Sequence, residues 1–185
     1  MLITVGAIFL LSMVILNVNR GIYWTNDTMV DNRYGILGVS LATSIIEKAT
    51  SKSFDAKTDG AAITTPTVLT AANSLGLESG ESFNDPDSFN DFDDFNCYKT
   101  KPKKDSIIVE GMNSYLHFWT YCTVTYVKDG NPEAVSTTQT YHKRLNVTVT
   151  SPDLKIAYVE GKTKKLSNDS LSIKMSTVYS YWYFR

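Results

Sequence analysis

The chain opens with an unbroken apolar run. Residues 1–16 carry no charged side chain, and their polar side chains, Thr4 and Ser12, can hydrogen-bond back to a helix backbone. Sixteen residues in a helix cover about 24 Å, slightly less than the hydrocarbon core of a bilayer at about 30 Å. Apolar and aromatic residues within 18–24 extend the run to an interfacial aromatic belt. The pattern therefore predicts a single membrane span.

The apolar pattern continues past this span at helical spacing. Large apolar residues recur three to five positions apart, which predicts one long helix from about residue 2 to residue 50; they are Ile36, Leu37, Leu41, Ile45 and Ile46. An ordinary single-pass anchor, which is the alternative, needs only the span. The second, amphipathic part of the helix needs a partner surface, which we expect to be the sheet of a head domain and other copies of the same helix.

The helix also contains weak helix formers, and its start lacks the marks of a cleavable signal. Asn17, Asn19 and Gly21 interrupt the apolar run, so we expect the helix to melt there on assembly. A signal peptide would have a basic start and a small-x-small cleavage site, and neither is found near Met1. We therefore expect this segment to be retained.

A region rich in Asp and Phe follows at 83–98, within an irregular connection that we place at 51–105. Phe89, Phe92 and Phe95 stand three positions apart, which puts them on one side of a tight helical turn and leaves the carboxylates on the other. The carboxylates are either calcium ligands or solvated turn residues that cap the loop, and the second interpretation is preferred. The calcium candidates are Asp85, Asp87, Asp91, Asp93 and Asp94.

Alternation of apolar and polar residues predicts strands in the last part of the chain, 106–185. The expected strands cover 106–110, 115–127, 135–150, 154–159 and 171–184, separated by polar turns. Local connections of this kind predict an antiparallel meander. The sequence therefore predicts an α+β fold, with a long N-terminal helix (1–50, apolar over 1–24 and amphipathic over 25–50) packed on a C-terminal antiparallel sheet.

Charge and candidate chemistry narrow the function. With 18 Lys and Arg against 19 Asp and Glu, the net charge is −1, so no global field attracts nucleic acid, and contact with a membrane must be hydrophobic. His117 and His142 lie in predicted strands, without a nucleophile elbow, a phosphate loop or a metal-binding His pair nearby. We expect no enzyme and no cofactor other than calcium.

Two further features fit an exported protein. Cys97 and Cys122 form an even pair, so one disulfide closing a loop of about 25 residues is expected, with two free thiols as the alternative. Asn26, Asn146 and Asn168 each begin an Asn-x-Ser/Thr motif and are weak glycosylation candidates.

The layout resembles that of the type IV pilin and pseudopilin superfamily: an apolar N-terminal helix, an amphipathic continuation, a connecting loop and an antiparallel sheet. The stretch DFDDFNCY at 91–98 is similar to an Asp-rich element in the connecting loop of some pilin-like proteins, in which glycine commonly stands where this chain has Cys97. Family members usually carry glutamate where this chain has Val5. They are also made with a short basic leader, so the resemblance implies that Met1 begins the mature chain.

The resemblance implies a structural subunit of an extracellular filament built from identical subunits. The chain would wait in the inner membrane and be moved into the filament by pilus assembly machinery. The apolar residues expected to form the polymerisation core are Met1, Leu2, Ile3, Val5, Ile8, Phe9, Leu10, Leu11, Val14, Ile15 and Leu16. The alternatives are a minor pilin or pseudopilin of a secretion system, and a membrane-anchored surface protein that binds a ligand on its tyrosine-rich sheet.

Overall fold

The computed structural model describes residues 2–60, 62–100, 106–108, 115–160 and 163–182. Their side chains are described except at 2–3, 24–33, 106–108, 115–116, 152–160 and 163–171. Met1 therefore lies outside the described residues, and Leu2 and Ile3 lie outside those with described side chains. The chain forms two units, 1–37 and 38–185. The boundary falls inside the first helix, so its last turns belong with the sheet.

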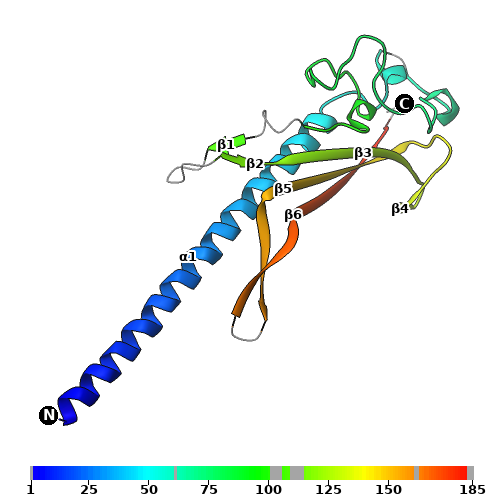
Figure 1. Cartoon of the computed structure of the whole chain (residues 1–185). Helices are drawn as coiled ribbons and strands as arrows, with labels where there is room; N and C mark the ends of the chain where they lie inside the picture. Colours follow the sequence, from blue (N-terminus) through cyan, green and yellow to red (C-terminus); the bar gives the residue numbers. More distant parts are fainter. Residues whose placement is uncertain (1, 61, 101–105, 109–114, 161–162, 183–185) are drawn as a thin grey trace. The chain divides into compact units, whose positions relative to one another are not determined.

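The first element is a single helix, α1 (Leu2–Thr50), with the bounds that the sequence predicts (Figure 1). Asn17, Asn19 and Gly21 are all helical, so melting at these positions on assembly stays a prediction. At the other end, the Ser51 hydroxyl donates to the Lys48 carbonyl at 2.7 Å, which satisfies one of the last carbonyls of the helix.

The buried face of the last turns of α1 is made of small residues. Gly38, Ala42 and Ala49 are buried or nearly so, whereas the large residues predicted to pack there are half-buried or, at Ile36, exposed. A Cβ atom added to Gly38 would lie 2.5 Å from Ile173 Cδ1, so a side chain at this position would require Ile173 to move. Leu37, Leu41, Ile45 and Ile46 are partly buried, so their packing against the sheet stays a prediction, whereas the exposed Ile36 departs from it.

The sheet region holds four antiparallel strands in the order β4-β3-β5-β6, and a separate pair, β1-β2 (Figure 1). The strands are β1 (Ser106–Ile108), β2 (Tyr115–His117), β3 (Trp119–Lys128), β4 (Asn131–Val135), β5 (His142–Glu160) and β6 (Thr163–Ser180). The general α+β layout with an antiparallel sheet is therefore confirmed. Residues 109–110, predicted to continue the first strand, lie outside the described residues.

The sheet differs from the predicted meander in two places. The turn predicted at 151–153 is absent, because β5 runs through it with a shift of register between Ser151 and Lys155, as in a β-bulge. The polar stretch 161–169, predicted to be a turn, mostly belongs to β6. Strand β4 was not predicted, and it lies at the sheet edge beside β3, so the chain passes from β4 to the far side of β3 to form β5.

The connection between α1 and the sheet contains three short 3-10 turns: η1 (Ala56–Thr58), η2 (Pro66–Val68) and η3 (Asp93–Phe95). Phe89, Phe92 and Phe95 are buried as predicted, in contact with one another or with Tyr98 and Tyr179. The aspartates from 91 to 94 are buried as well, so the prediction that these carboxylates face solvent is wrong. Their burial brings acidic groups into the interior of the head.

Candidate functional site

Four aspartates and one lysine meet in the interior beneath the connection. We define this acid–lysine cluster as Asp55, Asp91, Asp93, Asp94 and Lys143, all of which have 0% exposed surface. The first aspartate follows α1, the next three come from the segment around η3, and the lysine comes from β5. The two loop segments are held together because Phe92 N donates to Ser53 O at 2.9 Å.

Lys143 lies at the centre of the cluster. Its Nζ donates to the Phe54 carbonyl and to Asp55 Oδ2, both at 2.8 Å, and also to Asp93 Oδ1. The same atom lies 4.6 Å from the centre of the Phe54 ring and 5.3 Å from that of Tyr126, close enough for cation–π attraction. The lysine is therefore desolvated, and protein atoms replace the water around it.

Backbone amides hold the aspartates in place. Asp55 caps η1 by accepting from Lys57 N, and it also accepts from Thr70 N and Thr70 Oγ1. Asp91 accepts from the amides of Ala56, Asp93 and Asp94 at 2.6, 2.8 and 3.2 Å. These donors fix both loops around Lys143, which explains why a stretch so rich in aspartate folds inward.

The cluster contains four carboxyl groups and one amine, and this imbalance, together with burial, shifts the pKa values of the aspartates. Burial, opposed by Lys143, raises the pKa of Asp93, and burial together with the charges of Asp93 and Asp94 raises the pKa of Asp91 to about 9. For Asp55, burial acts to raise the pKa, but attraction and hydrogen bonding from Lys143 outweigh it and lower the pKa. The cluster therefore retains protons at neutral pH, mainly away from Asp55.

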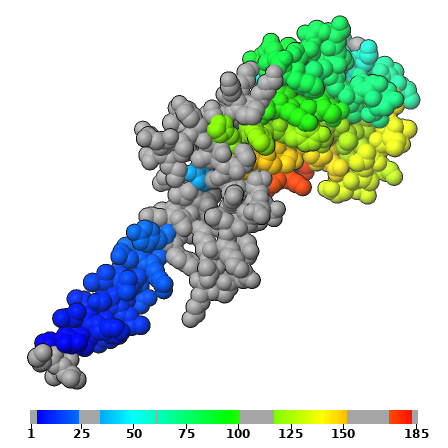
Figure 2. All heavy atoms as spheres, in the orientation of Figure 1, coloured from blue at the N-terminus to red at the C-terminus, as the bar shows by residue number. Residues whose placement is uncertain are grey.

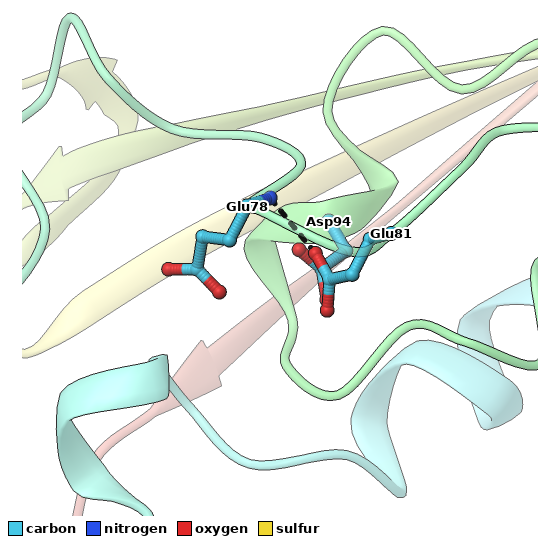
Figure 3. A group of neighbouring side chains, drawn as sticks. All are labelled: Glu78, Glu81 and Asp94. Atoms are coloured by element: carbon cyan, nitrogen blue, oxygen red, sulfur yellow. Dashed lines mark hydrogen bonds between the residues drawn. The ribbon is translucent and has the colours of Figure 1, made fainter.

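Three carboxylates form a second group at the edge of the cluster, as Figure 3 shows: Glu78, Glu81 and Asp94. They offer one oxygen each within 4.8 Å of one another, a spacing that a divalent cation with oxygen ligands can bridge. Glu81 Oε2 accepts from Glu78 N at 2.8 Å, whereas Glu81 Oε1 and Asp94 Oδ1 are buried without a hydrogen-bond partner among the described residues.

A shared proton satisfies the same two oxygens without a metal. Burial, with a hydrogen bond to Glu81, raises the pKa of Asp94 to about 7. Protonated Asp94 Oδ1 can then donate to Glu81. Protonation of Asp94 is therefore one way to satisfy the two oxygens, and a cation bridging the three carboxylates is another.

The five predicted calcium ligands do not converge on one site. Asp85 and Asp87 are exposed, and Asp87 pairs with Lys48 of α1. Asp91 is occupied by backbone amides, and Asp93 by Lys143. Of the five, Asp94 alone belongs to the carboxylate group with Glu78 and Glu81, two residues that no pattern in the sequence had singled out.

The predicted disulfide is not formed. Cys97 and Cys122 are both free thiols, the first exposed and the second buried in β3. The two residues are neighbours through the backbone, because Cys97 N donates to Cys122 O at 3.0 Å. Cys97 adopts φ 63°, the left-handed conformation that favours glycine. The prediction failed because spacing in the sequence says nothing about which way each thiol faces.

The apolar N-terminal segment forms the second candidate site. Residues 4–23 are helical, with a mean hydropathy of 1.7, and none of this segment is buried (Figure 2). Length and composition suffice to cross a membrane, although a signal sequence has the same properties. Predicted core residues with described side chains are exposed by 53% or more: Val5, Ile8, Phe9, Leu10, Leu11, Val14, Ile15 and Leu16.

Of the three glycosylation motifs, one has a described asparagine side chain. Asn26 and Asn168 lie outside the residues with described side chains. Asn146 lies within β5, between β3 and β6, and its Nδ2 donates to Thr123 Oγ1 at 3.4 Å. A position inside a sheet is unlike the surface loops in which glycans are attached, which argues against modification at Asn146.

Lys143 and Asp55, the residues that organise the cluster, were not among the residues predicted from the sequence. A signal for Lys143 was present: Leu145, Val147 and Val149 alternate on the buried face of β5, and Lys143 continues the same alternation. A lysine at a core position of a strand predicts a buried acidic partner. Asp55 carried no comparable signal.

No protein-family model, curated protein or solved structure matches this chain. Its function is therefore inferred from its own residues.

Proposed function

We propose that this protein is a structural subunit of an extracellular filament of the type IV pilus kind. The subunit is inserted in the membrane before assembly, and it polymerises with identical subunits through its apolar N-terminal helix. The acid–lysine cluster fixes the loop of the head, and it has no catalytic role in this proposal.

One observation carries the proposal: a helical segment of apolar side chains that is exposed along its whole described length. Burying a large apolar side chain is worth roughly 1.5 to 3 kcal/mol, so the segment 4–23 strongly disfavours contact with water. Lipid satisfies it before assembly. In a filament, a bundle of the same helices replaces the lipid contacts by packing.

The conformation of Cys97 gives separate support. The resemblance places a glycine, in related loops, where this chain has Cys97, and φ at that residue is 63°. A left-handed residue is where glycine is favoured by the absence of a Cβ atom. The loop geometry thus fits an element in which glycine is the usual residue.

The decisive experiment is assembly of the full chain from detergent. We expect uniform fibres by negative-stain electron microscopy when detergent is removed. A Leu11→Asp variant places a charge in the apolar segment and should abolish fibres, because an unpaired charge is costly among apolar helices. The matched control, Val135→Asp, changes a residue of β4 that is 51% exposed, and it should leave assembly intact.

Other outcomes favour the other candidates. Short assemblies that form only with a second protein would indicate a minor subunit. Detergent-soluble monomers with affinity for a ligand would indicate an anchored binding protein, and one surface favours that candidate. It is a cavity of about 360 Å³ lined by Lys99, Thr100, Trp119, Thr120, Tyr121, Thr148 and Thr150.

A further inference from the structure

The contacts of Lys143 with its two carboxylate partners differ in one respect. Both Asp55 oxygens have further donors, from Lys57, Thr70 and, at 3.4 Å, the Tyr126 hydroxyl. Asp93 Oδ1 meets Lys143 Nζ, while Asp93 Oδ2 is buried without a hydrogen-bond partner among the described residues. Asp93 thus has fewer hydrogen-bond donors around it than Asp55, and its remaining interaction is with the side chain of Asp91.

Lys143 and its two carboxylate partners are also shielded from water. Lys143, Asp55 and Asp93 have no exposed surface, and the rings of Phe54 and Tyr126 lie over the amine. In such surroundings the cost of removing two charges from water offsets much of the attraction between them. Burial also raises the pKa of Asp93, which favours its acid form.

We propose that Lys143 and Asp93 become joined by an amide bond between Nζ and Cγ, with loss of one water molecule. The ammonium first passes a proton to the Asp93 carboxylate, giving an amine and a carboxylic acid. The Nζ lone pair attacks Cγ, and the Asp55 carboxylate takes the proton that Nζ releases. Asp55 returns this proton to the departing hydroxyl, which leaves as water. No oxidant, reductant or co-reactant is consumed, and Asp55 is regenerated.

The product replaces two buried charges by a neutral amide. Formation of the amide removes one carboxylate oxygen and one buried ion pair, and the new N–H can donate to Asp55 Oδ2 or to the Phe54 carbonyl, both 2.8 Å from Nζ. Asp93 and Lys143 are 50 positions apart, so the bond ties the connecting loop covalently to β5. A subunit with this cross-link resists pulling on its head.

Intact mass spectrometry of the folded, full-length chain tests this proposal. We expect the mass to be lower by one water molecule than the sequence requires, even after denaturation. A protease digest should give a branched peptide that joins the segments around Asp93 and Lys143. The Lys143→Met and Asp93→Ala variants should have the masses of their sequences, whereas Lys99→Met, at an exposed lysine, should still lack one water.

Two further variants test the chemistry itself. Asp93→Asn can form the same bond by releasing ammonia, so its mass should fall by one ammonia relative to its own sequence. Asp55→Asn should leave a larger fraction of chains unlinked, because proton transfer is lost. A wild-type chain with its full sequence mass overturns the proposal, as does a loss of water that persists in Lys143→Met. Complete linkage in Asp55→Asn overturns the role given to Asp55.

Discussion

The N-terminal segment and the acid–lysine cluster place side chains in opposite ways. Residues 4–23 expose apolar side chains in a helix, whereas the cluster buries five ionisable side chains, including Lys143, at 0% exposure. Each arrangement is costly unless a partner compensates it. The cluster finds its partners within the same chain, in backbone amides and in Lys143. The segment has none within the described part of the chain, and the proposed function assigns this role to lipid and to other copies of the helix.

The two regions therefore point to different kinds of role. The charges of the acid–lysine cluster have partners within the chain, so we expect the cluster to stabilise the head. Exposed apolar surface points to assembly. Substitutions in the head test whether its stability depends on partners within the chain that compensate buried charges and close contacts. The largest loss of stability is expected at Lys143.

Replacing Lys143 removes the charge that compensates the aspartates. We expect Lys143→Met to lower the free energy of unfolding by about 3–5 kcal/mol, because the variant loses the contacts of Lys143 with Asp55 and Asp93, both as an ion pair and as the proposed amide. Denaturant titration of the full chain in detergent, followed by tyrosine and tryptophan signals, measures this. Lys99→Met serves as the control, since that lysine is exposed, and equal losses in both variants would contradict a special role for Lys143.

The second prediction concerns the close contact between Gly38 and the sheet. Gly38→Val should destabilise the head by about 1–3 kcal/mol, since the added atoms would collide with Ile173. The same titration measures the loss. Shortening the opposing side chain with Ile173→Ala should recover part of it in the double variant. Additive losses in the two single variants would show that the contact is absent.

The third prediction is a pH dependence from Asp94. Its pKa in the folded chain is about 7, above the ordinary value of 3.8, so the folded chain binds more protons between these values and stability falls as pH rises through 7. Between pH 6 and pH 8 the loss should be about 1 kcal/mol. Asp94→Asn keeps a donor toward Glu81 at every pH and should make the profile shallower by this amount. Asp91, whose pKa is also raised, and both histidines contribute equally to the two profiles, so the difference between wild type and Asp94→Asn, measured in a chelator, isolates Asp94. An identical slope in both would contradict the assignment.

Calcium provides a second probe of the same carboxyl group. If a cation binds Glu78, Glu81 and Asp94, added calcium should raise the melting temperature at pH 8 more than at pH 6, because protons compete for Asp94. Glu78→Gln should remove the increase, while Asp85→Asn, an exposed aspartate, should keep it. A melting temperature insensitive to calcium would leave the shared proton as the explanation for the two unpartnered oxygens.

The last and mildest substitution is at Cys97. Cys97→Gly should raise the free energy of unfolding by about 0.5–1 kcal/mol, because glycine accepts a φ of 63° without a steric penalty from Cβ. Cys97→Ala keeps the penalty and should show no comparable gain. If both variants behave alike, the loss of the thiol, and not the backbone conformation, accounts for the change.

The sequence predicted the parts of the fold that follow from local periodicity. The bounds of α1 and the burial of Phe89, Phe92 and Phe95 follow from spacing alone. The inward turn of the aspartates does not, since Asp55 and Lys143 are 88 positions apart and their pairing depends on how the strands register. Strand β4 was missed because its first residues, 131–133, belong to a polar stretch that favours a turn.

Strand β4 affects how readily the sheet can pair with the sheet of a neighbouring molecule. An exposed sheet edge invites pairing with the edge of another molecule, and a filament would hold many heads at high local concentration. Strand β4 has only five residues, and its Pro132 has no backbone N–H to offer. The Arg144 guanidinium already takes the carbonyls of Pro132 and Glu133, at 3.0 and 3.2 Å. The short edge formed by β4 is thus poorly suited to extend into a neighbour's sheet.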